Sequence, residues 1–192
     1  MTPLLADVGI PMIVLQLPAM VVLLIPVVLL EAFVVNRYLR IGFAKCASGV
    51  FRANLASTLL GFPLAWALML CVEFASGFLL EGAHRIFPAV ERIAGSPIFE
   101  VASLPLFAAW VPGEELWTIP IAAAVLLIPS FYISVWIERK ICARIWSSEP
   151  PTVLSSARKA VWQANVVSYL FLFGVAVCYE VYVFATKGWP KW

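Results

Sequence analysis

Four long apolar runs constrain the fold of this chain more than any other feature of its sequence. They cover about Ile10–Val35, Leu55–Leu80, Leu116–Ile137 and Val161–Thr186. A helix that crosses the hydrocarbon core of a bilayer needs roughly 20 consecutive, mostly apolar residues, and each run is long enough. Only 12% of the residues are charged, against about 25% in a typical soluble domain. The sequence therefore predicts an all-α integral membrane protein, a single polytopic domain over residues 1–192 with four transmembrane helices.

A fifth apolar run, Ile98–Val111, is too short to cross a membrane. It contains Glu100 and Pro105 and is followed by Pro112. A helix of about 14 residues is only about 21 Å long, whereas the hydrocarbon core is roughly 30 Å thick. We expect this run to form a short interfacial segment within an outer loop, residues 81–115.

The distribution of Lys and Arg among the loops predicts the orientation. Loop 36–54 carries four basic residues and no acid, and loop 138–160 carries five basic residues and two acids. The loop at 81–115 carries two basic residues and five acids. Since cytoplasmic loops are enriched in Lys and Arg, we expect the two basic loops in the cytoplasm and both termini outside. The most natural location is a bacterial cytoplasmic membrane.

Two short motifs occur twice along the chain. Leu-Leu-Ile-Pro stands at 23–26 and at 126–129, an offset of 103 residues, and Ala-Asn-x-x-Ser stands at 53–57 and at 164–168, an offset of 111. This order predicts two tandem helical hairpins, repeat 1 at about 10–80 and repeat 2 at about 116–186. Both would cross the membrane in the same direction, related by a pseudo-twofold axis along the membrane normal. The alternative is chance similarity between runs rich in Leu, Ile and Val.

The second motif places Asn54 and Asn165 at the expected cytoplasmic start of an outward-going helix. Ser57 and Ser168 follow three residues later, on the same helix face. The Asn side chains suit helix N-caps or hydrogen bonds between helices. The functional alternative is a pair of polar sites that face each other across the axis.

Three acidic residues, Glu31, Glu73 and Glu180, fall within the predicted spans, where ionisable groups are costly and often functional. At the offset of 103 the counterpart of Glu31 is Ser134, so we expect this acid to lie outside the repeated pattern. Glu73 has no basic neighbour in the sequence. It is expected either to be hydrogen-bonded for packing or to line a proton or cation route.

Equipment for catalysis is missing from the sequence. There is one histidine, the four cysteines form no CxxC pair, and no nucleotide-binding glycine motif or catalytic serine motif occurs. We expect no enzyme activity, no cofactor and no metal. The net charge of +2 is too small to favour nucleic acid, so the expected partners are the lipid bilayer and other membrane protein subunits.

These features favour a non-catalytic membrane subunit that packs within or stabilises a larger assembly. One alternative is a small oligomeric transporter or channel for an ion or small solute, and another is an assembly factor for a membrane complex. A transporter would gather Asn54, Glu73 and Asn165 around one water-accessible cavity. A scaffold would instead seal these side chains within helix contacts.

Overall fold

The computed structural model describes residues 10–86, 96, 99, 103–111 and 119–187. Apart from one pair of two-residue strands, its regular structure is helical. The long helices are α1 (Met12–Leu39), α2 (Phe43–Ala56), α3 (Phe62–Ile86), α6 (Ile119–Ile145) and α7 (Pro151–Lys187). Taking α2 and α3 as one continuous helix, four helices are long and apolar enough to cross a membrane. The prediction of four spanning-length helices is confirmed.

A π-helical turn, η1 (Ser57–Gly61), joins α2 to α3 without a break. Its place follows from Pro63, because proline has no backbone N–H to donate to the carbonyl four residues earlier, and its ring crowds that carbonyl. A wider turn relieves this conflict while the chain stays helical. Such single π turns are frequent at functional sites.

The loops predicted at 36–54 and 138–160 are mostly helical, which corrects the sequence-based boundaries. Only Arg40–Gly42 and Trp146–Pro150 separate the helices there. The first turn uses Arg40 with φ 53° and Gly42 with φ 96°, a backbone conformation that glycine adopts at little cost. The helices run past the apolar segments because charged residues end a hydrophobic span without ending helical hydrogen bonding.

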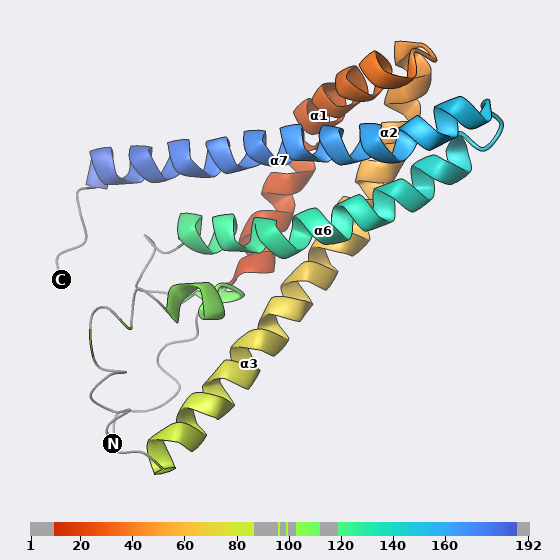
Figure 1. The fold of residues 1–192 in the computed structure, drawn as a ribbon. Helices are drawn as coiled ribbons and strands as arrows, with labels where there is room; N and C mark the ends of the chain where they lie inside the picture. The colour runs from red at the N-terminus through yellow and green to blue at the C-terminus, as the bar shows by residue number, and fades with distance from the viewer. Residues whose placement is uncertain (1–9, 87–95, 97–98, 100–102, 112–118, 188–192) are drawn as a thin grey trace.

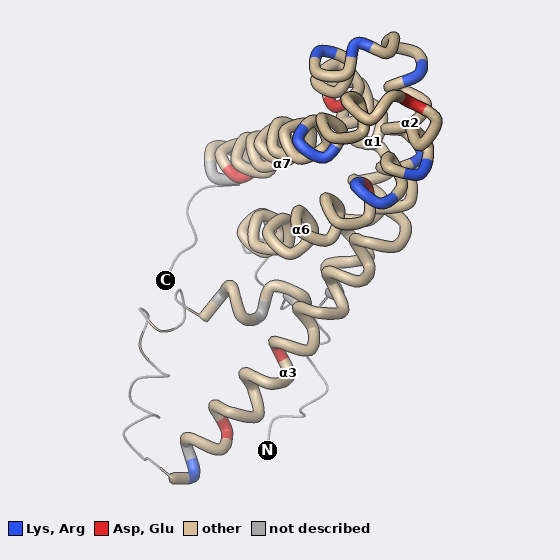
Figure 2. Tube along the Cα trace, turned by 45° about the vertical axis from the view of Figure 1, so that its right-hand side comes forward, with Lys and Arg blue, Asp and Glu red and all other residues tan. Residues whose placement is uncertain are grey.

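The helices come together at one end of the molecule and separate at the other (Figure 1). We call the end with the turns Arg40–Gly42 and Trp146–Pro150 the closed end. At the opposite, splayed end, α3 diverges from α6 and α7 in both views (Figures 1 and 2). Most of the described Lys and Arg residues gather at the closed end (Figure 2), whereas Arg85 and Lys187 lie near the other ends of α3 and α7.

Small residues bring the helices into contact at the closed end. A Cβ added to Gly49 would lie 2.9 Å from Cζ2 of the fully buried Trp146, so α2 and α6 approach closely only because position 49 has no side chain. Gly61 meets Ile137 in the same way, at 3.0 Å. The larger apolar core cluster lies around Trp146, with Val35, Val50 and Ala160 among its members.

The described part of Ile98–Val111 forms a 3₁₀ turn, η2 (Leu104–Phe107), and a strand, β2 (Trp110–Val111). This strand pairs antiparallel with β1 (Ile10–Pro11), directly before α1. No spanning helix occurs in the described part of this segment. Residues 98, 100–102 and 112–118 lie outside the described residues, and the depth predicted for the segment stays a prediction.

Candidate functional site

Six polar side chains from both halves of the chain meet where α1, α6 and α7 pack around the α2–η1 junction. All are buried, with exposed fractions between 0% and 4%. We call this group the glutamate network, and its members are Glu31, Asn54, Ser57, Glu138, Asn165 and Ser168.

Glu31 of α1 receives one hydrogen bond from each half of the chain. From the same half, Nδ2 of Asn54, which stands 23 residues later, donates to Oε2 of Glu31 at 2.6 Å. The hydroxyl of Ser168, on α7, donates to Oε1. Glu31 therefore connects the first two long helices to the last one.

Glu138 of α6 also accepts from one Asn and one Ser, and the two halves of the chain exchange their roles. From the same half, Nδ2 of Asn165, which stands 27 residues later, donates to Oε2 of Glu138 at 2.7 Å. The hydroxyl of Ser57, from the other half, donates to its Oε1 at 2.7 Å. The four bonds therefore form two matching sets, each linking the two halves of the chain.

The Asn side chains are fixed by their own helices. Asn54 Nδ2 also donates to the carbonyl of Val50, and Asn165 Nδ2 to that of Val161, both at 3.1 Å. These bonds run back by four residues inside continuous helices, so neither Asn is an N-cap. That interpretation is wrong, and the helix–helix hydrogen bond proposed beside it is the observed role.

Glu138 was missed by sequence reasoning. The pattern gave Ser134 as the counterpart of Glu31, but Ser134 hydrogen-bonds to the Tyr169 hydroxyl at 2.9 Å. Glu138 stands four residues later, about one helical turn, and therefore faces the same way. It was assigned to a basic loop because Arg139 and Lys140 follow it, whereas α6 continues to Ile145.

The network contains two carboxyl groups and no basic partner. The two carboxyls also interact with each other, and the ion pairs found among the described residues involve neither of them. Two buried carboxyls held only by neutral donors need a proton or a cation to offset their charge. The arrangement can therefore serve as a neutral clamp between helices or as a holder of one positive charge.

A cavity of about 20 Å³ adjoins the network, room for about one water molecule. Its polar lining comprises Asn54, Ser57, Thr58, Ser134, Glu138 and Tyr169. Three apolar residues, Met20, Phe62 and Leu172, separate it from a larger groove of about 440 Å³ between α1, α6 and α7. The polar cavity thus lies beneath an apolar groove.

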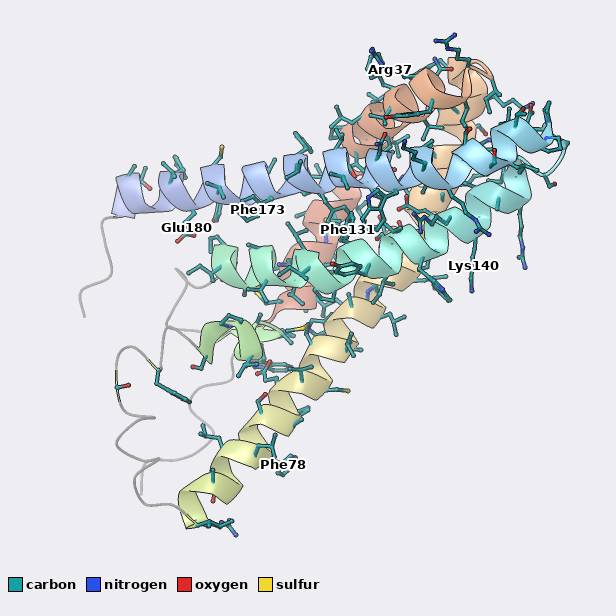
Figure 3. All side chains as sticks on the ribbon, in the orientation of Figure 1. Arg37, Phe78, Phe131, Lys140, Phe173 and Glu180 are labelled. Carbon is teal, nitrogen blue, oxygen red and sulfur yellow. The ribbon has the colours of Figure 1, made fainter. Side chains whose placement is uncertain are left out.

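Two of the acids singled out from the sequence lie away from this network. Glu73 of α3 lies near the backbone amides of Ala109 and Trp110, and its Oε2 is buried without a hydrogen-bond partner among the described residues. Trp66 helps to hold the 103–111 segment against α3, because its Nε1 donates to the Ala109 carbonyl at 3.0 Å. Glu180 lies towards the far end of α7 (Figure 3), and its carboxyl oxygens have no hydrogen-bond partner among the described residues.

Within the described residues, no group of three or more His, Cys, Asp and Glu side chains is arranged as a metal site. Of the seven candidate residues from the sequence, five lie in the glutamate network. No family model, no curated protein and no solved structure matches this chain.

Proposed function

We propose that this chain is a non-catalytic integral membrane subunit that packs within, or stabilises, a larger membrane assembly. The observation that carries the proposal is the sealing of the glutamate network. Its hydrogen bonds connect the helices of the chain to one another, and Asn165 and Ser168 are fully buried. A clamp of this kind holds helices in a fixed arrangement that a partner can recognise.

The splayed end offers the surface for such a partner. Large apolar side chains on α3 are widely exposed there, with Phe78 at 77% and Leu79 at 75%. Exposed apolar side chains of this size are suited to contact with lipid or with an apolar helix of another subunit.

We propose further that the chain consists of two tandem hairpins, residues 10–80 and 116–186. The matching partners of Glu31 and Glu138 support this, since a duplication with a twofold axis would produce each contact twice. Both short turns lie at the closed end, as parallel repeats require. Such a pair shares one direction across the membrane.

The proposed setting is a bacterial cytoplasmic membrane, with the closed end in the cytoplasm and both termini outside. The gathering of most Lys and Arg residues at the closed end supports this orientation (Figure 2), because cytoplasmic loops are enriched in these residues. A cysteine introduced at position 90 should react with a membrane-impermeant reagent added outside, and one at position 45 should not. The reverse labelling would overturn the orientation.

A second candidate function is a small oligomeric transporter or channel for an ion or small solute. The polar cavity supports it, because the carboxyl of Glu138 lies there beneath an apolar groove and only Met20, Phe62 and Leu172 intervene. Movement of these three side chains would connect the two spaces.

Purification from native membranes in a mild detergent tests the main proposal. We expect mass spectrometry to find at least one membrane protein in fixed ratio with the tagged chain. Phe78→Ser with Leu79→Ser should release it. The matched control is Val22→Ser with Ile25→Ser on α1, two residues that are equally exposed, and it should retain the partner.

The alternative makes a different prediction for the same preparations. If no partner co-purifies and vesicles containing the chain alone conduct protons or Na⁺, the subunit proposal is overturned. Loss of that flux in Glu138→Gln would then assign the transport to the glutamate network.

A further inference from the structure

A groove at the closed end lies on the outer face of α6 and α7, away from the glutamate network. It consists of two adjoining cavities of about 400 and 220 Å³, which share Arg139, Ala143 and Arg158. The rest of the lining of the larger one is Tyr132, Val135, Trp136, Lys140 and Trp162. We call this the basic groove.

The positive charge of the basic groove has no counter-ion in the described protein. No acidic residue lines either cavity. Glu138 belongs to the glutamate network, and Glu149 of the nearby turn pairs with Lys45. Arg139 also has a buried Nε without a hydrogen-bond partner in the described residues. Three cations and one unused donor therefore favour an anionic ligand.

Aromatic rings hold two of these cations in place without neutralising them. The Nζ of Lys140 lies 3.6 Å from the centroid of the Trp136 ring, and the guanidinium carbon of Arg139 lies 5.3 Å from that of Trp162. A ring attracts a cation through its negative face and leaves the N–H groups free. The cations are thus oriented for a ligand.

An apolar surface leads from the basic groove towards the splayed end. On α6, Ile128, Tyr132, Trp136 and Lys140 follow one another at intervals of four residues, so they share one face. Ile128, Tyr132 and Trp136 are exposed by 61%, 62% and 57%. The face therefore changes from aliphatic through aromatic to cationic, in the order of the acyl chain, interface and head group of a phospholipid.

We propose that the basic groove binds the phosphate head group of an anionic phospholipid, with an acyl chain along the Ile128–Tyr132–Trp136 face. Arg139 and Arg158 hold the phosphate, because guanidinium groups bind phosphate oxygens in pairs. Lys140 contributes charge at the rim. A free phosphate would use the cations but not the continuous apolar face, which is why the ligand is a lipid. This site is independent of the proposed subunit function.

Native mass spectrometry of the full chain in mild detergent tests the site. Phosphatidylglycerol and phosphatidylcholine with identical acyl chains are titrated separately, and we expect the anionic lipid to bind at one copy per chain and at least tenfold more tightly. Each basic residue near an anionic lipid surface contributes about fivefold in affinity. Arg139→Gln with Arg158→Gln should therefore weaken phosphatidylglycerol binding about 25-fold.

The matched control is Arg37→Gln with Arg52→Gln, which removes the same charge at the same end. Both residues are exposed and neither lines the basic groove, and Arg37 and Lys140 lie on different sides of the closed end (Figure 3). This control should change affinity less than about twofold at physiological salt. Should the groove variant lose its native elution volume, the exposed Lys140→Gln gives a separate test, with an expected loss of about fivefold.

Three results would overturn the proposal. Equal affinity for the two lipids would mean that head-group charge is not recognised. An equal loss in the Arg37 and Arg52 control would mean that net charge attracts the lipid without a site. Displacement of phosphatidylglycerol by inorganic phosphate alone, at tens of millimolar, would mean that the acyl chain contributes nothing.

Discussion

The two ends of this molecule hold their helices together by different means. At the closed end, Gly49 of α2 and Gly61 of η1 admit close approach of Trp146 and of α6, and six polar side chains join helices from both halves of the chain. At the splayed end, α3 separates from α6 and α7, and its described contacts with the rest of the chain include those of Trp66 and Glu73 with the 103–111 segment. In a membrane, contacts between apolar side chains of two helices are little more favourable than their contacts with lipid, because lipid tails are equally apolar. Close approach and hydrogen bonds therefore decide where the helices meet.

The largest expected effect comes from removing one carboxyl of the glutamate network. Glu138→Leu removes the carboxyl that accepts from the Ser57 hydroxyl and from Asn165 Nδ2, and leaves these donors only the backbone carbonyls of their own helices. Each lost buried hydrogen bond costs about 1–3 kcal/mol, and the loss is partly offset because Glu31 no longer faces a second carboxyl, so we expect the free energy of unfolding to fall by about 2–4 kcal/mol. Titration with dodecyl sulfate in mixed micelles, followed by Trp fluorescence, measures it.

The matched control places the same change at the other end. Glu180→Leu removes a carboxyl whose two oxygens are buried without a hydrogen-bond partner among the described residues. Because no hydrogen bond is lost, it should leave the free energy of unfolding unchanged or raise it slightly. Glu138→Gln, which keeps an acceptor, should fall between the two. Equal losses in the Glu138 and Glu180 variants would show that the network does not distinguish the two ends.

A smaller effect, of opposite sign at the two ends, is expected from added methyl groups. Gly49→Ala would place a Cβ 2.9 Å from the buried ring of Trp146, and overpacking of this kind costs about 1–3 kcal/mol. A Cβ at Gly77 in α3 meets nothing within 4 Å. Because alanine is the better helix former, Gly77→Ala should stabilise the protein by about 0.5–1 kcal/mol. The same unfolding titration compares the two, and a loss in both variants would contradict the contrast.

Substitutions of Glu73 test whether a polar contact stabilises the splayed end. Glu73→Gln keeps an acceptor for the amides of Ala109 and Trp110 and should preserve stability and assembly. Glu73→Leu removes the carboxyl that lies near these amides, and should weaken the attachment of the 103–111 segment by about 1 kcal/mol. Limited proteolysis within 87–118 reads out that attachment. If Gln abolished ion flux while the protein stayed intact, Glu73 would instead belong to a transport route.

The sequence predicted the spans and most of the network because both depend on local patterns. It missed Glu138 for a reason that the distances along the chain explain. Glu31 stands five residues after Pro26 of the first Leu-Leu-Ile-Pro motif, whereas Glu138 stands nine residues after Pro129 of the second. An insertion of four residues is close to one helical turn of 3.6, so the side chains keep the same face while the alignment fails. The Leu-Leu-Ile-Pro motifs, the two Glu residues and the Ala-Asn-x-x-Ser motifs lie at offsets of 103, 107 and 111 residues, so no single offset aligns all three pairs.

The separation of α3 from α6 and α7 had no signal in the sequence. Both α3 and α7 are mostly apolar at this end, apart from a few residues such as Glu73 and Glu180, and a helix in lipid does not need a polar face to mark its outside. Helix ends were also misjudged, because Arg37 and Lys140 marked the edge of the apolar run and not the end of the helix. Local composition therefore predicted which segments are long and apolar enough to cross a membrane, and tertiary contacts decided the shape.

The smallest expected difference concerns the surface ion pairs at the two ends. Lys45 and Glu149 join the two halves of the chain at the closed end, and the Glu149 side chain is only 13% exposed. Glu81 and Arg85 form an i,i+4 pair on α3, with both side chains more than half exposed. Double-mutant cycles should give a coupling of about 0.3–0.5 kcal/mol for the α3 pair. The closed-end pair should reach about 1 kcal/mol, because partial burial weakens screening by solvent.

Raising the salt concentration to 1 M should remove most of the coupling between Glu81 and Arg85 and spare part of the coupling between Lys45 and Glu149. Equal couplings with equal salt dependence would mean that the packing around Lys45 and Glu149 gives their pair no advantage, and that the difference between the two ends resides in the buried network alone.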